Sequence, residues 1–209
     1  MKRGKLITFE GIEGVGKSTQ LAFTRQHLER HQISVCLTRE PGGTSVSERI
    51  RAILLDRQEP AMTAMTELLL MFAARNEHCA RVIFPALDAG TWVISDRFND
   101  ASYAYQGGGR GLPAESIAIL ERLVLQNLRP DLTFLLDAPV EVALGRAAAR
   151  RGEPDRFESE RADFFTRARA AYLARARAEP MRFRILDATR AIDIVACDIN
   201  AALDELVAK

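Results

Sequence analysis

Residues 11–18 constrain the fold more than any other segment, because they read Gly-x-x-x-x-Gly-Lys-Ser between a predicted strand and a predicted helix. The glycines let successive backbone N–H groups turn toward a phosphate, and the N-terminus of the following helix adds its positive dipole. In such a loop Lys17 reaches the β- and γ-phosphates of a nucleotide, and Ser18 ligates Mg²⁺. The segment therefore predicts an ATP site that uses Mg²⁺. We expect this cradle to comprise Gly11, Glu13, Gly14, Val15, Gly16, Lys17, Ser18 and Thr19.

Around this loop the chain alternates short apolar runs with longer helical patterns. Predicted strands cover residues 6–10, 34–38, 92–95, 132–137 and 182–186. Predicted helices cover residues 17–31, 44–57, 62–88, 113–128, 139–150, 158–178 and 191–207. Strands that are apolar on both faces and joined by helices predict a five-stranded parallel sheet covered on both sides. This is the α/β three-layer sandwich of P-loop NTPases, and the length suits one domain spanning residues 1–209.

Polar residues follow the predicted strands at the sheet edge where ligands bind in such folds. Four of the strands run into Glu10, Arg39, Asp96 and Asp137, and the fifth meets Asp187. Ligands of open parallel sheets lie beyond the carboxyl ends of the strands. These ends therefore locate a site independently of any motif.

Composition argues against several other classes of protein. No apolar run approaches the roughly 20 residues that span a bilayer, and the basic N-terminus leads into a strand rather than a signal-peptide core. We therefore expect a cytoplasmic protein with no membrane contact. No long basic tract suggests nucleic-acid binding. The cysteines form no Cys-x-x-Cys pair and the histidines no His-Glu-x-x-His motif, so neither a disulfide framework nor a dedicated metal site is expected among Cys36, Cys79, Cys197, His27, His31 and His78.

The phosphate loop alone does not distinguish kinases from GTPases or transport ATPases. The chain lacks the Asn-Lys-x-Asp element that reads guanine and the Leu-Ser-Gly-Gly signature of transporters. It contains, in order, Phe-Glu-Gly at 9–11, Thr-Arg-Glu-Pro-Gly-Gly-Thr at 38–44, Phe-Ala-Ala-Arg at 72–75, Asp-Arg-Phe at 96–98 and Gln-Gly-Gly-Gly-Arg at 106–110. This set resembles the motifs of the thymidylate kinase family, in register from the first strand to about residue 157.

The resemblance implies transfer of the ATP γ-phosphoryl group to dTMP, forming dTDP for dTTP synthesis, on a nucleoside monophosphate kinase-like fold. The acceptor is already an anionic phosphate oxygen, so no general base is needed. The reaction instead needs Arg, Lys and Mg²⁺ to offset the charge of two phosphates. Only four of the 29 lysines and arginines are lysines, which fits this demand. The resemblance also implies a homodimer, formed through apolar helix faces that include residues of the 62–88 segment.

Family positions at the acceptor phosphate and the base map onto five residues of this chain. By the resemblance, Arg39 and Arg97 clamp the acceptor phosphate, and Asp96 positions Mg²⁺ at the end of its strand. Phe72 stacks on thymine, and Arg75 hydrogen-bonds the O4 atom of the base. Phe72 and Arg75 are three residues apart, on one face of a predicted helix, so both can address one ligand. Lys17, Asp96 and Arg97 are the catalytic residues expected outside the lid.

Further positions are implied near thymine and the deoxyribose. Ser102, Tyr105 and Gln106 correspond to them, with Tyr103 as the alternative to Tyr105. A tyrosine ring against C2′ would exclude a ribose hydroxyl and so favour deoxynucleotides. The three glycines at 107–109 are expected either to contact the ligand directly or to form a flexible turn.

A mobile lid near residues 146–158 is expected to supply the remaining catalytic arginine. Family members place this arginine either in the phosphate loop or in the lid, and this phosphate loop has none. The chain thus resembles the lid-arginine subtype typical of many bacterial enzymes. Glu13 would then face the acceptor sugar and accept a hydrogen bond from its 3′-hydroxyl. The lid candidates are Arg150, Arg151 and Arg156, with Arg151 favoured, Arg156 supporting it, and the choice between Arg150 and Arg151 open.

Two other functions remain open from the sequence. One is a kinase for another nucleoside monophosphate or a nucleoside. The other is a P-loop ATPase that acts as a regulatory switch, in which the acceptor residues would have no purpose.

Overall fold

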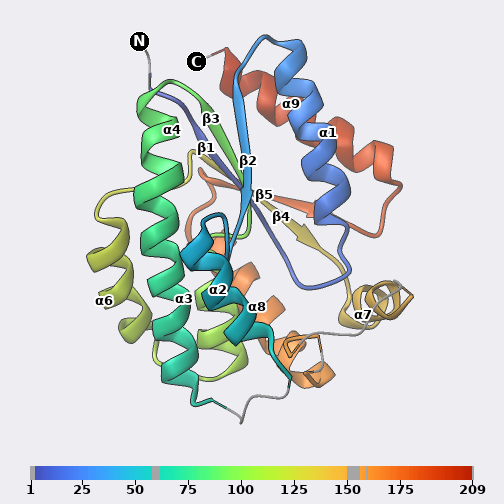
Figure 1. The fold of residues 1–209 in the computed structure, drawn as a ribbon. Helices are drawn as coiled ribbons and strands as arrows, with labels where there is room; N and C mark the ends of the chain where they lie inside the picture. The colour runs from blue at the N-terminus through green and yellow to red at the C-terminus, as the bar shows by residue number, and fades with distance from the viewer. Residues whose placement is uncertain (1–2, 58–61, 150–155, 159, 209) are drawn as a thin grey trace.

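The computed structural model describes residues 3–57, 62–149, 156–158 and 160–208, arranged around one central sheet (Figure 1). Five parallel strands follow the order β2-β3-β1-β4-β5. Their bounds are β1 Leu6–Glu10, β2 Val35–Arg39, β3 Trp92–Asp96, β4 Leu132–Asp137 and β5 Phe183–Asp187. The predicted five-stranded parallel sheet is confirmed, with strand ends shifted by at most one residue.

Helices cover both faces of this sheet, with α1 and α9 on one side and the α3 and α6 layer on the other (Figure 1). Their bounds are α1 Lys17–Arg30, α2 Ser45–Leu55, α3 Ala64–His78, α4 Phe84–Asp88, α5 Asn99–Ser102, α6 Ala114–Leu125, α7 Val140–Ala148, α8 Ala162–Ala178 and α9 Ile192–Val207. Two π-helical segments, η1 Cys79–Ile83 and η2 Tyr103–Gly109, continue α3 and α5. None of the described helices is long and apolar enough to cross a membrane.

The core lies on both faces of β1, the central strand. All five residues of β1 are buried, as expected for a strand between two helical layers. On one face Phe9 packs against Phe134 of β4, with ring centroids 5.1 Å apart. On the other, Thr8 and Thr133 are fully buried and join their hydroxyls at 2.8 Å, so neither is left unpaired. Strand β1 thereby holds the phosphate loop on a rigid base.

The glycine segment differs from the sequence prediction. Residues 107–109 are not a flexible turn but the end of the π-helical segment η2. The absence of side chains lets α8 pack closely, because a Cβ atom at Gly108 would lie 2.7 Å from the Arg167 carbonyl oxygen. A Cβ atom at Gly109 would collide with the Phe164 ring. These glycines therefore fix η2 against α8, and η2 carries Tyr105 and Gln106.

Candidate active site

The phosphate loop curves over the start of α1 and borders a cavity of about 960 Å³. Gly14 has a φ of +79° and lies so close to α7 that a Cβ atom there would collide with the Ala143 carbonyl. Gly11 and Val15 do not line the cavity: the Gly11 carbonyl accepts internal hydrogen bonds and Val15 is buried in the core. The cavity is lined from the loop by Glu13, Gly14, Gly16, Lys17, Ser18 and Thr19.

Lys17 is buried beneath this cavity and turned back onto its own loop. Its Nζ atom donates to the carbonyl oxygens of Gly11 and Ile12, each at 3.1 Å. Burial, with a further contribution from the Arg97 charge, lowers the pKa of Lys17 to about 8. A cation held at such a cost is one that a phosphate would stabilise, which fits its predicted role.

Asp96 ends β3 on the wall of the same cavity as Ser18. Its Oδ1 atom is buried and has no hydrogen-bond partner among the described residues. A buried carboxylate oxygen without a partner is costly unless a cation or water completes it. The hydroxyl and carboxylate oxygens present are ligands that Mg²⁺ accepts.

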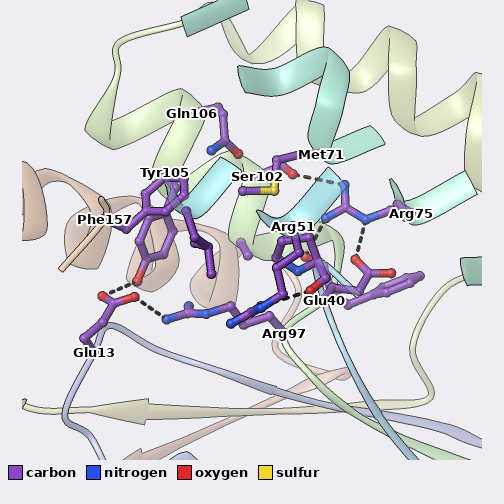
Figure 2. Close-up of a pocket in the computed structure, with 14 residues that line it drawn as sticks. Glu13, Glu40, Arg51, Met71, Arg75, Arg97, Ser102, Tyr105, Gln106 and Phe157 are labelled. Atoms are coloured by element: carbon purple, nitrogen blue, oxygen red, sulfur yellow. Dashed lines mark hydrogen bonds and ion pairs between the residues drawn. The ribbon is translucent and has the colours of Figure 1, made fainter. Parts of the chain in front are cut away.

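A second cavity, of about 600 Å³, lies between the phosphate loop, α2, α3 and the α5–η2 helix (Figure 2). Glu13 forms one wall. Its carboxylate accepts a hydrogen bond of 2.7 Å from the Tyr105 hydroxyl and one of 2.8 Å from the Arg97 guanidinium. Burial and the Glu13 charge raise the pKa of Tyr105, so this phenol stays protonated and donates to Glu13.

The opposite wall of the second cavity holds Arg75 in a fixed orientation. Its Nε atom donates to Glu40 at 2.7 Å, and its two terminal nitrogens donate at 3.0 Å to the Ser102 hydroxyl and the Phe98 carbonyl (Figure 2). Burial alone would raise the pKa of Glu40, but the Arg75 charge and His78 outweigh it, so the pKa is lowered. Three of the five guanidinium N–H groups are thus used for orientation, which leaves others for a ligand.

Arg97 follows β3 in a left-handed backbone conformation, with a φ of +67°. Such a conformation costs a non-glycine residue roughly 1–3 kcal/mol and persists where the surroundings enforce it. Here its NH1 atom donates to the Gly11 carbonyl at 2.8 Å and to the Tyr172 hydroxyl at 3.1 Å. The strained backbone therefore aims the guanidinium back across the end of the sheet, toward the phosphate loop.

The two cavities meet at Glu13, Arg51 and Arg97, which line both of them. Arg51 lies on α2, where its NH1 atom donates to the Pro41 carbonyl at 2.9 Å. Sequence reasoning missed Arg51. Two cations therefore stand between a phosphate-binding loop and a second ligand-sized cavity, an arrangement suited to bringing two phosphates together.

Known proteins match this chain over nearly its whole length. The sequence model of the thymidylate kinase family matches residues 9–199. The chain belongs to the thymidylate kinase family. The thymidylate kinase of Alkalilimnicola ehrlichii is 54% identical over 100% of this chain and 96% of its own length. That of Chromobacterium violaceum is 54% identical over 99% of this chain and 97% of its own. The crystal structure of thymidylate kinase from Ehrlichia chaffeensis has a TM-score of 0.78 and 32% identity, covering 97% of this chain and 99% of that one.

Two residues assigned by the family resemblance lie outside the second cavity. Arg39 donates to both carboxylate oxygens of Glu48, at 2.9 and 2.8 Å, on the exposed side of α2, and lines neither cavity. Phe72 is buried in a cluster with Leu68 and Ile117. Arg51 lines the second cavity, whereas Arg39 does not.

Met71, rather than Phe72, reaches the cavity from α3 (Figure 2). Residues four apart on a helix lie almost directly above one another, and Met71 is four residues before Arg75. Phe72 is three residues before Arg75, and its ring lies 4.6 Å from the guanidinium carbon on the core side. In this family member a thioether therefore takes the wall position that the resemblance assigns to an aromatic ring.

The remaining predicted residues divide between the cavities and the lid. Ser102, Tyr105 and Gln106 line the second cavity. Arg156 lines neither: it donates at 2.7 Å to both the Leu54 carbonyl and the Glu67 carboxylate, and so fastens the end of the predicted lid segment to α2 and α3. Arg146 lines the first cavity instead. Arg150 and Arg151 lie outside the described residues.

Proposed function

We propose that this chain transfers the γ-phosphoryl group of ATP to the 5′-phosphate of dTMP, giving dTDP and ADP. The observation that carries the proposal is the shared wall of Glu13, Arg51 and Arg97 between the two cavities. ATP would occupy the cavity over the phosphate loop, and dTMP the cavity beside Arg75. The family membership supports the choice of thymidylate as acceptor.

The transfer needs little from the protein except position and positive charge. The acceptor phosphate oxygen is anionic at neutral pH, so it attacks without a general base. Arg51 and Arg97 would offset the repulsion between the two phosphates and hold them in line. Lys17 would leave its loop carbonyls for the β- and γ-phosphates. The charge that develops on the transferring group would then be surrounded by fixed donors.

A bound Mg²⁺ fits the donors at the end of β3. Ser18 and Asp96 would hold it, and the unpaired Asp96 Oδ1 atom supports this assignment. When bound, the ion supplies charge neutralisation at the β- and γ-phosphate oxygens.

At the base and sugar, recognition would come from the second cavity. Arg75 would hydrogen-bond the thymine O4 atom, and Met71 would pack against the ring. Tyr105, held by Glu13, would stand against C2′ of the sugar and exclude a ribose hydroxyl. Glu13 would accept a hydrogen bond from the 3′-hydroxyl once the bound nucleotide displaces one of the hydrogen bonds that Glu13 accepts now.

The chain would function as a single domain. Its lid, near residues 146–158, would complete the active site. Arg150 or Arg151 would contact the transferring phosphate, and Arg156 would anchor the lid at Glu67 rather than touch the reacting atoms. Replacing both Arg150 and Arg151 by alanine is then expected to cut kcat while dTMP affinity stays near normal. An unchanged kcat would remove the lid arginines from the mechanism.

The chain is also proposed to act as a homodimer in the cytoplasm. Helices α3 and α6 expose apolar side chains that a partner copy would cover, namely Met65, Leu69, Ile119 and Leu123. Covering these side chains in a dimer would remove apolar surface from water, which favours association.

The experiment that tests the proposed function is a panel of nucleoside monophosphates and nucleosides, with ADP release as the readout. We expect kcat/KM to be highest for dTMP. A faster acceptor other than dTMP or dUMP would indicate a different kinase. ADP release that is equal with and without an acceptor would indicate an ATPase switch.

A further inference from the structure

Two histidines on α1 converge on an aspartate of α9, on the sheet face opposite the α3 and α6 layer (Figure 1). His27 and His31 are one turn apart, with ring centroids separated by 4.8 Å. The Nε2 atom of His27 lies 2.7 Å from Oδ1 of Asp204, and the Nε2 atom of His31 lies 3.4 Å from the same oxygen. Three atoms that can ligate a metal thus lie within 4.8 Å of one another.

We propose that His27, His31 and Asp204 form a binding site for a divalent transition-metal ion of the Zn²⁺ type, which joins α1 to α9. Two imidazoles and one carboxylate suit Zn²⁺, Co²⁺ or Ni²⁺, whereas Mg²⁺ prefers oxygen ligands throughout. Three protein ligands leave a fourth tetrahedral position for water. From the sequence alone no metal site is expected at these histidines, because Asp204 is 173 positions beyond His31 and only the fold brings it there.

The geometry requires small changes to accept such an ion. Tetrahedral zinc with bonds of about 2.0–2.2 Å places neighbouring ligand atoms roughly 3.3–3.5 Å apart. The 3.4 Å separation between His31 and Asp204 already matches this value. The His27–Asp204 separation of 2.7 Å would lengthen by about 0.6–0.8 Å. The His31 ring must move toward His27, and its side chain is 44% exposed and therefore free to change rotamer.

The surroundings combine a fixed ligand with an accessible one. The His27 side chain is only 10% exposed, whereas that of Asp204 is 54% exposed, so an ion can enter from solvent onto a buried anchor. One turn earlier on each helix, the buried Thr24 Oγ1 and Asn200 Oδ1 atoms have no hydrogen-bond partner within the described part of the chain. Polar groups left unpaired in this way are typical of an interface completed by ordered water or an ion.

The site is remote from the reacting groups. His27 is ten residues beyond Lys17 on α1, roughly 15 Å along the helix axis. Binding is therefore expected to stabilise the fold rather than to change the chemistry. An ion that binds the folded chain and not the unfolded one raises the free energy of unfolding and the Tm.

The test is a titration of zinc into the full, chelator-treated chain in excess Mg²⁺, with isothermal calorimetry as the readout. The Tm is measured in parallel. We expect one zinc ion per chain and a rise in Tm. His31→Ala and Asp204→Asn should each weaken zinc binding by roughly tenfold or more and abolish the rise in Tm. Because His31 is exposed, His31→Ala should keep the Tm of the metal-free chain, which shows that it still folds.

A thiol is the main competing ligand, and α9 offers a matched control. Cys197 is exposed on that helix, and Cys197→Ser should bind zinc as the unaltered chain does. The proposal is overturned if the unaltered chain binds no zinc. It is equally overturned if zinc binding survives both ligand substitutions, or if it is lost in Cys197→Ser.

Discussion

At the scale of single residues, function depends on where a few charged groups are forced to lie. Arg97 is held in a left-handed conformation and reaches the Gly11 carbonyl, Tyr172 and Glu13. Lys17 is buried near it, and burial lowers its pKa. An anionic ligand would offset the backbone strain at Arg97 and the desolvation of Lys17.

The lowered pKa of Lys17 predicts a pH dependence of ATP binding. A lysine with a pKa of about 8 is charged below that pH and neutral above it. If only the charged form holds the phosphates, ATP affinity should fall roughly tenfold from about pH 7 to about pH 9. Isothermal titration calorimetry with ATP at several pH values in this range measures the change in affinity.

Two variants separate Lys17 from its neighbours in this experiment. Burial and the Asp100 charge raise the pKa of Glu10 to about 8, so Glu10 titrates in the same range. Glu10→Gln should keep the pH dependence of ATP binding, whereas Lys17→Met should bind ATP weakly and lose it. A pH dependence that persists in Lys17→Met would contradict the assignment.

Met71 and Phe72 are adjacent in sequence, but substitutions at the two positions should change different quantities, the KM for dTMP and the Tm respectively. Met71→Ala removes a wall of the acceptor cavity and should raise the KM for dTMP by roughly tenfold, the equivalent of about 1.4 kcal/mol of lost burial. Phe72→Leu alters the core and should lower Tm by about 2–4 °C with a smaller change in KM. Steady-state kinetics and thermal melts distinguish them. A larger KM effect from Phe72→Leu would restore the aromatic residue to the base site.

At the scale of elements, the packing of η2 against α8 positions the acceptor residues. Strands were predictable because residues such as those of β1 are apolar on both faces, a local property of the sequence. The α5–η2 helix was not predictable from the sequence, because three consecutive glycines are locally typical of a turn and only the contact with α8 holds them in a helix. Likewise nothing in the sequence separates Arg39 from Arg51, because the choice depends on how α2 is placed.

A matched pair of glycine substitutions tests this packing. Gly109→Ala would push a methyl group into the Phe164 ring and should cost about 1–3 kcal/mol of stability. Because Tyr105 lies in the same segment, the KM for dTMP should also rise. Gly107→Ala meets only the end of the Ile117 side chain, at 3.2 Å, and should change both far less. Equal effects from the two variants, by thermal melts and kinetics, would refute the packing role.

At the scale of the whole molecule, the exposed apolar layer on α3 and α6 predicts self-association. Leu69 is 50% and Leu123 73% exposed, on helices that pack against each other. Leu123→Glu should shift the chain from dimer to monomer in sedimentation velocity, because a charge would be buried in the interface. Met181, which is 88% exposed between α8 and β5 and belongs to neither helix, provides the control, and Met181→Glu should leave the dimer intact. A monomeric unaltered chain would contradict the dimer.

The two cavities and the arginines between them predict direct transfer: the phosphoryl group passes from one nucleotide to the other without release to water. Phosphorus-31 NMR of the chain with ATP, Mg²⁺ and dTMP follows that phosphate directly. We predict that the β-phosphate signals of dTDP and ADP grow in equal amounts, with no inorganic phosphate. Accumulation of inorganic phosphate while dTMP remains unchanged would contradict the account.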